Sequence, residues 1–223
     1  MRRTPALALS SLLLVTLAAC GSAQQSSPPN TEAATDTATA AADCPPAEGA
    51  ATRTVTFSAP PPMCIDAAKS YTAEFTTDAG KFTVALDAAK APKTVNNFVF
   101  LARHQFYDGT VFHRVIKGFM NQGGDPEGTG RGGPGYEIED ELPAEGEYEV
   151  GSIATANAGP NTVGSQFFII TGDAGVALPA KYSLFGKVTD GMDVVHAIEA
   201  DGSDMDVPPT KVHTIESVRI TEK

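Results

Sequence analysis

Apolar and polar side chains alternate along residues 111–116, which is the pattern of a β-strand. One face of this strand carries Phe112, Arg114 and Ile116, so that a guanidinium lies between two large apolar side chains. The simplest interpretation from residue types alone is a core strand whose Arg114 pairs with a carboxylate. The opposite face carries Val111, His113 and Val115.

The segment 118–124 follows directly and extends this surface. Met120 and Gln122 share one face of a further strand or turn, and the glycines at 123 and 124 let the backbone bend sharply after it. The two segments therefore bring Arg114, Phe119, Met120 and Gln122 together on one sheet surface.

The chain from Lys69 onwards has the composition of a packed domain with several short strands. Because many short strands accompany only two helical patterns, we expect an all-β architecture. Further strands are expected at residues 71–77, 81–87, 148–155, 166–171, 183–189 and 211–221, with a hairpin turn at 78–80.

Each expected helix has one apolar stripe, which predicts one buried face. The first begins near Pro92 with Thr94 as its cap, and the second spans residues 190–199. The inward residues are Val95, Phe98, Val99 and Ala102 in the first helix, and Val194, Val195 and Ile198 in the second.

Residues 1–20 have the features of a secretory signal: two arginines, a short apolar run and small residues before Cys20. The small residues followed at once by cysteine resemble a bacterial lipobox, in which the thiol is lipidated after cleavage. An ordinary signal peptide that contains a cysteine is the alternative. If Cys20 is lipidated, the protein is extracytoplasmic and anchored to the bacterial cell membrane.

Residues 21–51 are rich in Ala, Thr, Ser and Pro and are expected to form a disordered tether. A Pro- and Cys-containing extension at 52–68 leads into the domain at 69–223. Outside the cytoplasm, Cys44 and Cys64 favour a disulfide over two free thiols, and a bridge closing about 20 residues constrains the unfolded chain by roughly 3 kcal/mol. A metal site is the less favoured alternative, since no histidine is nearby.

Charge and side-chain chemistry exclude several functions. The chain carries 27 acidic and 16 basic residues, a net charge of −11, which argues against nucleic acid or an anionic lipid surface as a partner. The glycine-rich segment 127–135 formally matches a nucleotide-binding pattern, but Pro134 prevents a regular helix after it, so we expect a mobile surface loop.

No hydrolase or metal centre is indicated by the polar residues. Ser165 and Ser183 lack the local motif of a nucleophile, and the four histidines show no metal-ligand spacing, so neither a metal nor a cofactor is expected. These histidines are His104, His113, His196 and His213.

Three motifs resemble the cyclophilins, the barrel-shaped peptidyl-prolyl cis/trans isomerases. They are His-Arg-Val-Ile with Gly-Phe-Met-Asn-Gln-Gly-Gly-Asp at 113–125, Ala-Asn-Ala-Gly-Pro-Asn-Thr-Val-Gly-Ser-Gln-Phe-Phe-Ile at 156–169, and Phe-Gly-Lys-Val at 185–188. The resemblance covers roughly residues 69–223. It implies an eight-stranded antiparallel closed barrel capped by two α-helices.

The resemblance also implies the residues of the site. Arg114 corresponds to the essential arginine, which favours the twisted, non-resonant amide by donating towards the prolyl nitrogen. The proline pocket would be formed by Phe119, Met120, Phe168 and Leu178, and the remaining substrate-binding positions by His113, Gln122, Ala156, Asn157, Gln166 and Tyr182. By residue type alone, the apolar members would be ordinary core, His113 a hydrogen-bonded structural histidine, and the amides strand caps.

The expected activity is isomerisation of Xaa-Pro bonds in exported proteins, by a monomer whose partners are proline-containing segments. A tethered chaperone or peptide-binding module that uses the same groove without turnover is the alternative. The chain has no tryptophan near 174–177, where many eukaryotic members hydrogen-bond cyclosporin, and Tyr182 stands where they have histidine. We therefore expect weak cyclosporin binding, which a nanomolar dissociation constant would refute.

Overall fold

The computed structural model describes residues 43–205 and 208–223. The predicted signal peptide, Cys20 and the tether up to residue 42 lie outside the described residues. Within them, no helix is long and apolar enough to cross a membrane.

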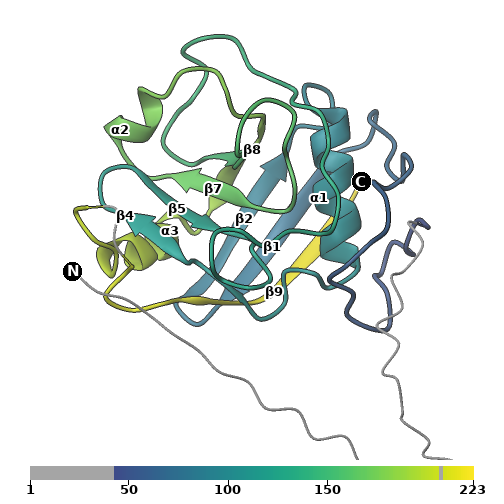
Figure 1. Ribbon diagram of the computed structural model, residues 1–223, viewed down its shortest axis with the longest axis horizontal. Coiled ribbons are helices and arrows are strands. Elements are labelled where there is room, and N and C mark those ends of the chain that lie inside the picture. The colour runs from purple at the N-terminus through teal and green to yellow at the C-terminus, as the bar shows by residue number, and fades with distance from the viewer. Residues whose placement is uncertain (1–42, 206–207) are drawn as a thin grey trace, which may run out of the picture. The chain divides into compact units, whose positions relative to one another are not determined.

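The described chain forms one antiparallel sheet with three helices (Figure 1). Its elements are β1 (Tyr71–Thr77), β2 (Gly80–Leu86), α1 (Pro92–Arg103), β3 (Thr110–Val111), β4 (Arg114–Ile116), β5 (Met120–Gly123), β6 (Ser152–Thr155), β7 (Phe167–Ile170), α2 (Asp173–Val176), β8 (Leu184–Asp190), α3 (Met192–Ala200) and β9 (Thr214–Glu222). Figure 1 shows α1 and α3 at opposite ends of the sheet.

The all-β prediction is confirmed, but the sheet has nine strands in the order β3-β9-β1-β2-β8-β6-β7-β5-β4 rather than eight. The predicted strand at 111–116 is broken into β3 and β4, because Phe112 and Val115 both enter the main core and strict alternation cannot place both there. The prediction that Phe112 and Arg114 share one face is therefore wrong.

The predicted closed barrel is a half-barrel in the structure. The strand order begins with β3 and ends with β4, and no ladder joins these two edges. One isolated bridge, between Val111 and Asp125, connects β3 to the residues that follow β5.

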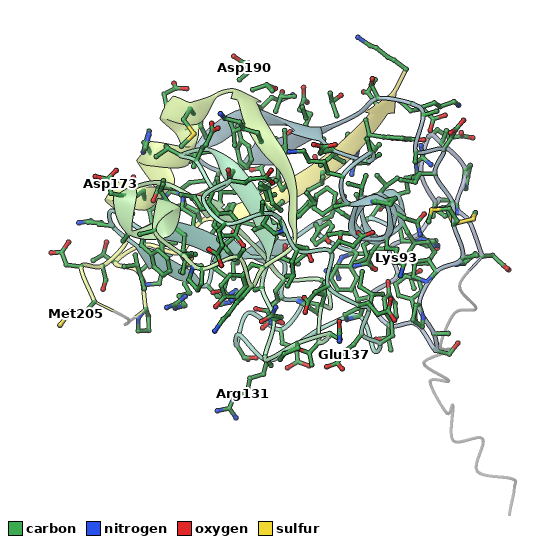
Figure 2. The ribbon with its side chains drawn as sticks, turned by 90° about the horizontal axis from the view of Figure 1, so that it is seen from above. Lys93, Arg131, Glu137, Asp173, Asp190 and Met205 are labelled. Atoms are coloured by element: carbon green, nitrogen blue, oxygen red, sulfur yellow. A yellow bond between two sulfur atoms is a disulfide. The ribbon has the colours of Figure 1, made fainter. Side chains whose placement is uncertain are left out.

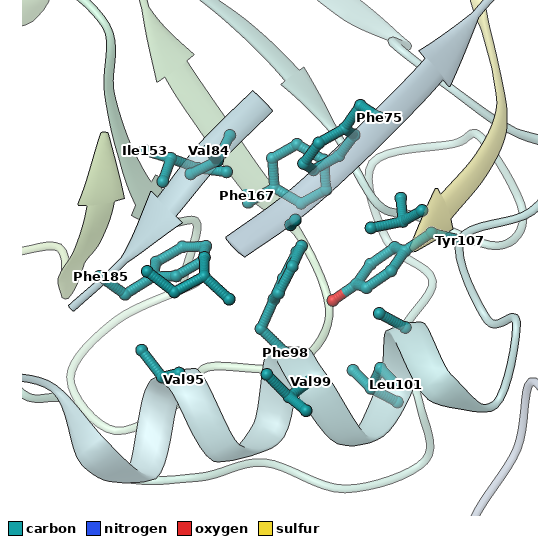
Figure 3. Close-up of a cluster of buried hydrophobic side chains, with 14 of the residues drawn as sticks. Phe75, Val84, Val95, Phe98, Val99, Leu101, Tyr107, Ile153, Phe167 and Phe185 are labelled. Atoms are coloured by element: carbon teal, nitrogen blue, oxygen red, sulfur yellow. The ribbon is translucent and has the colours of Figure 1, made fainter. Parts of the chain in front are cut away.

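The main core lies between α1 and the sheet, where Phe98 packs on the rings of Phe75, Tyr107 and Phe185 (Figure 3). The prediction of a single buried face for α1 is wrong, since every residue from Thr94 to Arg103 is buried. Its outer face is covered by the extension: the ring centroids of Phe57 and Phe100 lie 4.9 Å apart.

The start of α1 differs from the prediction. The helix begins at Pro92 after Ala91, and Thr94 lies inside the first turn without capping it. A distant carboxylate serves instead, since Glu141 accepts the backbone N–H groups of Lys93 and Thr94 at 3.1 and 2.7 Å. Because Pro92 has no N–H and Ala91 N donates to Asp87 O at 3.0 Å, this contact pairs the two amides that the helix start would otherwise leave unpaired.

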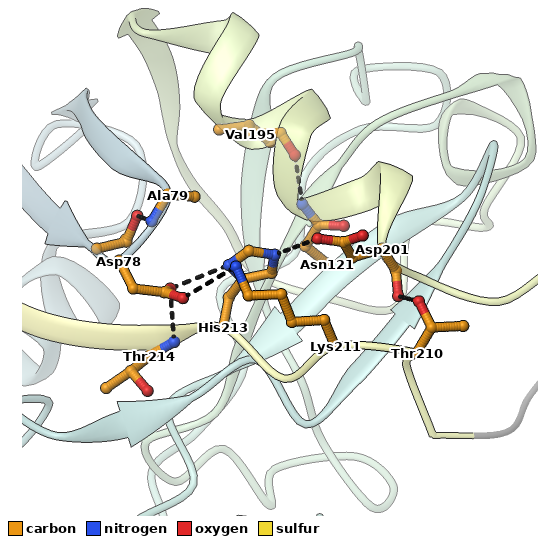
Figure 4. A network of polar contacts seen from close by, with 10 residues as sticks. Asp78, Ala79, Asn121, Val195, Asp201, Thr210, Lys211, His213 and Thr214 are labelled. Carbon is orange, nitrogen blue, oxygen red and sulfur yellow. Dashed lines mark hydrogen bonds and ion pairs between the residues drawn. The ribbon is translucent and has the colours of Figure 1, made fainter.

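The second predicted helix is α3, in which Val195 and Ile198 are buried and Val194 is half-buried. Its end is held by His213, which is 3 % exposed and lies between two carboxylates (Figure 4). The His213 Nδ1 atom is 3.0 Å from Asp78 in the β1–β2 turn, and Nε2 is 3.0 Å from Asp201 after α3. The helix α2 was not predicted.

Cys44 and Cys64 form a disulfide, visible as the yellow bond in Figure 2, with their Cα atoms 5.3 Å apart. The loop that it closes is attached to the last residue of α1 and to its N-terminal half. Ala50 donates to Arg103 O at 2.7 Å, and Cys64 N donates to the Asn96 side chain at 2.7 Å.

Candidate active site

Antiparallel register brings three of the predicted site residues into one row that crosses four strands. Arg114 of β4 lies opposite Gln122 of β5, which lies opposite Phe168 of β7, which in turn lies opposite Ala154 of β6. Because side chains at paired positions share a face of a sheet, the row forms one continuous surface.

This surface is the face of the sheet that points away from the main core. Phe167 and Ile169 of β7 enter the main core, whereas Phe168 and Ile170 belong to a second apolar cluster with Met120 and Tyr148. Asn121, between Met120 and Gln122, fixes β5 to α3 by donating to Val195 O at 2.8 Å.

A cavity of about 140 Å³ opens on the second cluster. Its lining contains nine of the predicted site residues: Arg114, Phe119, Met120, Gln122, Ala156, Asn157, Phe168, Leu178 and Tyr182. The floor is apolar, since Met120 is 1 % and Phe168 5 % exposed. The volume suits a ligand fragment of a few heavy atoms.

Arg114 forms the polar side of this cavity. Its Nη1 donates to Gln122 Oε1 at 3.2 Å, and its Cζ lies 5.8 Å from the centroid of the Phe119 ring. The hydrogen bonding continues away from the guanidinium, because Gln122 Nε2 donates to Gln166 Oε1 at 3.0 Å and Gln166 Nε2 donates to Gly132 O at 2.9 Å. The position of Gly132 thus bears on the orientation of Arg114.

Tyr182 closes the apolar side by an edge-to-face contact with Phe168, at 5.3 Å between ring centroids. Its backbone is held by Tyr148, a residue that the sequence patterns missed. The Tyr148 hydroxyl donates to Tyr182 O at 2.6 Å and accepts from Tyr182 N at 3.1 Å. Burial raises the pKa of Tyr148, so the hydroxyl stays protonated and able to donate.

Leu178 and Phe119 reach the cavity from two segments that are joined by backbone hydrogen bonds. Thr171 N donates to Phe119 O at 3.0 Å, and Ala174 N donates to Gly118 O at 3.2 Å. The short helix α2, which precedes Leu178, is therefore fixed to the turn that precedes β5.

The Asn157 amide group is itself held by neighbours. Its Nδ2 donates to Lys181 O at 2.9 Å and to Asp140 Oδ1 at 3.3 Å. Asp140 also accepts from Asn161 N at 2.7 Å, so this carboxylate fixes the 157–161 turn. The sequence patterns gave no indication of Asp140.

A second cavity of about 780 Å³ adjoins the first, because Gln122, Ala156 and Asn157 line both. Its lining includes Gln166 and most of the glycine-rich segment. His113, the remaining predicted residue, lines neither. Burial, assisted by Arg114 and opposed by Asp125, lowers the pKa of His113, so its ring is neutral at neutral pH.

The glycine-rich loop was predicted to be a mobile surface loop, but the side chain of Asp125 ties it down. This carboxylate, in a residue with 0 % exposure, accepts backbone N–H groups at 2.6 to 3.2 Å. Their donors are Glu127, Thr129, Gly130 and Gly132. A side chain at Gly132 would meet Asp125 Oδ1 at 2.0 Å, which explains the glycine there.

The arrangement places one guanidinium beside a small apolar cavity and a longer groove. Ser165 Oγ donates to Gly124 O at 2.7 Å and Ser183 Oγ accepts from Glu141 N at 2.8 Å, so both hydroxyls serve the backbone. No group of three or more His, Cys, Asp or Glu side chains in the described part of the chain is placed to hold a metal ion.

Comparison with known proteins identifies the same region. Residues 72–220 match the family described as cyclophilin type peptidyl-prolyl cis-trans isomerase/CLD. Over 168 residues the chain is 45 % identical to the probable peptidyl-prolyl cis-trans isomerase A of Mycobacterium leprae, which covers 67 % of this chain and 92 % of that protein.

Two further relatives extend the comparison to eukaryotes. The peptidyl-prolyl cis-trans isomerase-like 1 of Neurospora crassa is 45 % identical over 152 residues, covering 66 % of this chain and 93 % of that protein. A Cryptosporidium parvum cyclophilin type isomerase, crystallised in the presence of the dipeptide Ala-Pro, superposes with a TM-score of 0.62 at 35 % identity, covering 68 % of this chain and 99 % of that one.

Proposed function

Because the chain belongs to the cyclophilin-type peptidyl-prolyl cis-trans isomerases, we propose that Arg114 and the 140 Å³ apolar cavity carry this activity. The observation that supports the proposal is the guanidinium at the edge of a cavity whose floor, formed by Met120 and Phe168, is apolar. Such a cavity fits one pyrrolidine ring.

The reaction needs no covalent intermediate. Rotation about an Xaa-Pro bond is slowed by amide resonance, which contributes a barrier of about 18–20 kcal/mol. In the twisted amide the prolyl nitrogen becomes pyramidal and carries a lone pair. A donor that contacts this nitrogen stabilises the twisted state more than the planar one, and this difference accelerates rotation.

The residues around Arg114 would bind the proline ring and orient the guanidinium. Phe119, Met120, Phe168 and Leu178 hold the ring, while Gln122 keeps the guanidinium directed along the row. Residues on either side of the proline would lie along the 780 Å³ groove, beside Ala156 and Asn157.

The substrates we propose are proline-containing segments of exported proteins. The disulfide in the described structure supports an oxidising location, since such bonds persist outside the cytoplasm. A lipid anchor at Cys20 and a domain beginning near residue 69 are parts of the same proposal, as are a monomeric state and weak cyclosporin binding.

The test compares the full chain with Arg114→Ala in a coupled protease assay on a proline tetrapeptide. We expect kcat/KM to fall about 100-fold, the usual effect of removing one positioned donor. Arg219→Ala is the matched control, because this exposed arginine of β9 pairs with Asp108 and lines neither cavity, so its loss should leave the rate unchanged.

A peptide-binding module without turnover would give a different result. Wild type and Arg114→Ala would then both show background rates, while calorimetry would still detect proline-peptide binding. That outcome would replace the enzymatic proposal with the binding alternative.

A further inference from the structure

The extension before the family domain contains one deeply buried aromatic residue, Phe57. It is 1 % exposed and lies outside the segment 72–220 that matches the family. Its ring packs against Phe100, His104 and Tyr136, with centroids 4.9, 5.1 and 6.4 Å away. Phe57 therefore joins α1 to the end of the glycine-rich loop.

The backbone makes the same connection. Phe57 N donates to Pro134 O at 2.8 Å. Gly135, with φ +95°, lies so close that an added Cβ would meet Phe57 O at 2.6 Å. The extension and the loop are thus in direct backbone contact, without room for a side chain between them.

Tyr136 links this contact to another segment of the groove lining. Its hydroxyl donates to Asn97 Oδ1 at 2.6 Å, and Asn97 Nδ2 donates to Gly164 O at 2.8 Å. Pro134, Tyr136 and Gly164 all line the 780 Å³ cavity. Residues fixed by Phe57 are therefore walls of the groove that adjoins the proline cavity.

Phe57 lies within the loop that the disulfide closes, and this loop is fixed to the rest of the domain. Between Cys44 and Cys64 the chain is attached to the residue that follows α1, through Thr54 N to His104 O at 3.0 Å, and to the N-terminal half of α1, through Asn96 Nδ2 to Pro62 O at 2.9 Å. Opening the disulfide would release the N-terminal side of this loop from Cys64.

We propose that Phe57 is a positioning residue of the isomerase, which sets the groove wall formed by Pro134 and Tyr136 and so determines the affinity for residues that flank the proline. The disulfide keeps Phe57 in place. This inference rests on the proposed use of the groove, and it makes the extension part of the substrate site.

The experiment measures isomerisation by exchange NMR on the full chain with two substrates, a capped peptide of about four residues and one of about ten residues, which is long enough to cross the groove. Phe57→Leu should raise KM for the long peptide about threefold or more and change kcat/KM for the short peptide less than about twofold. Cys44→Ser/Cys64→Ser, or reduction of the wild type, should shift the long-peptide KM in the same direction.

Val218→Ala is the control for stability, since it truncates a buried strand residue outside both the extension and the loop. If Phe57→Leu changes both peptides by the same factor, or behaves like the control, the inference is wrong. If Phe57→Leu does not fold, the reduced wild type decides by the same comparison. If the wild type isomerises neither peptide, the proposed function fails first, which separates the two outcomes.

Discussion

Replacing Asp125 by asparagine should loosen the glycine-rich loop without changing the shape of the side chain. The carboxylate accepts four backbone N–H groups and the Thr129 hydroxyl. One oxygen receives Glu127 N at 2.8 Å, and the other receives the remaining donors. An amide has only one oxygen, so in either orientation its NH₂ group faces at least one backbone N–H.

The magnitude follows from these contacts. A hydrogen bond to a charged group contributes about 1.5–3 kcal/mol and a neutral one about 0.5–1.5 kcal/mol, so the loss of charge costs roughly 1 kcal/mol per bond. One unpaired N–H adds a further cost of about 1 kcal/mol, and water reaching the exposed Thr129 and Gly130 reduces the total. We expect a decrease of about 3 kcal/mol in the free energy of unfolding.

The pH dependence gives a second measure of the same contacts. Burial alone would raise the pKa of Asp125, but the four backbone N–H groups outweigh it, so the pKa lies below the ordinary value of 3.8. Because the folded pKa is depressed, the stabilisation is present above the unfolded pKa and is lost as pH falls through the folded pKa. Asp125→Asn should lack this part of the acid-induced loss.

The assay is urea unfolding at pH 7 and at acidic pH, with Asp173→Asn as a control of equal charge change at an exposed position. Hydrogen exchange should show faster exchange at Gly130 and Gly132 in Asp125→Asn. A variant within about 0.5 kcal/mol of wild type, the usual range of surface substitutions, would refute the reasoning.

Two other substitutions test contacts outside the loop. Glu141→Ala should lower the free energy of unfolding by about 1 kcal/mol, because it removes the acceptor for the first turn of α1. Glu141→Gln should recover part of this loss. Equal stability of both variants and the wild type would contradict the capping role. Burial raises the pKa of Asp78, but the hydrogen bonds from His213 and Thr214 lower it more, so this pKa lies below 3.8. The stabilisation that the Asp78 carboxylate gives to the folded state is therefore lost as the pH falls through the folded pKa. Unfolding of Asp78→Asn followed between neutral and acidic pH should therefore show a shallower loss than wild type, and an unchanged slope would exclude this contribution.

Local patterns predicted the part of the site that depends on strand alternation. Met120 and Gln122 share a face, as their spacing indicated, and register then places Phe168 beside them. The motifs supplied the correspondence that brings Leu178 and Tyr182 to the same cavity, which no periodicity in the chain would have shown.

What the patterns missed depends on contacts between distant segments. Helical periodicity predicted one buried face for α1, but Phe57 covers the other face. Phe57 lies 43 residues before Phe100, the helix residue that it contacts. The break between β3 and β4 has the same origin, since Phe112 turns inward where its backbone N–H donates to His213 O at 2.9 Å. Neither contact leaves a signal in a short window of sequence.

The glycine-rich loop has two supports, and they should act on different steps. Asp125 fixes Gly132, whose carbonyl accepts from Gln166 and so bears on Arg114 through Gln122. Phe57 fixes the other end of the loop, at Pro134. A disturbed guanidinium would slow rotation for every substrate, whereas a displaced groove wall would weaken only substrates long enough to contact it. Asp125→Asn should therefore lower kcat for short and long peptides alike, and a defect limited to long peptides would show that Gly132 does not act through the glutamines.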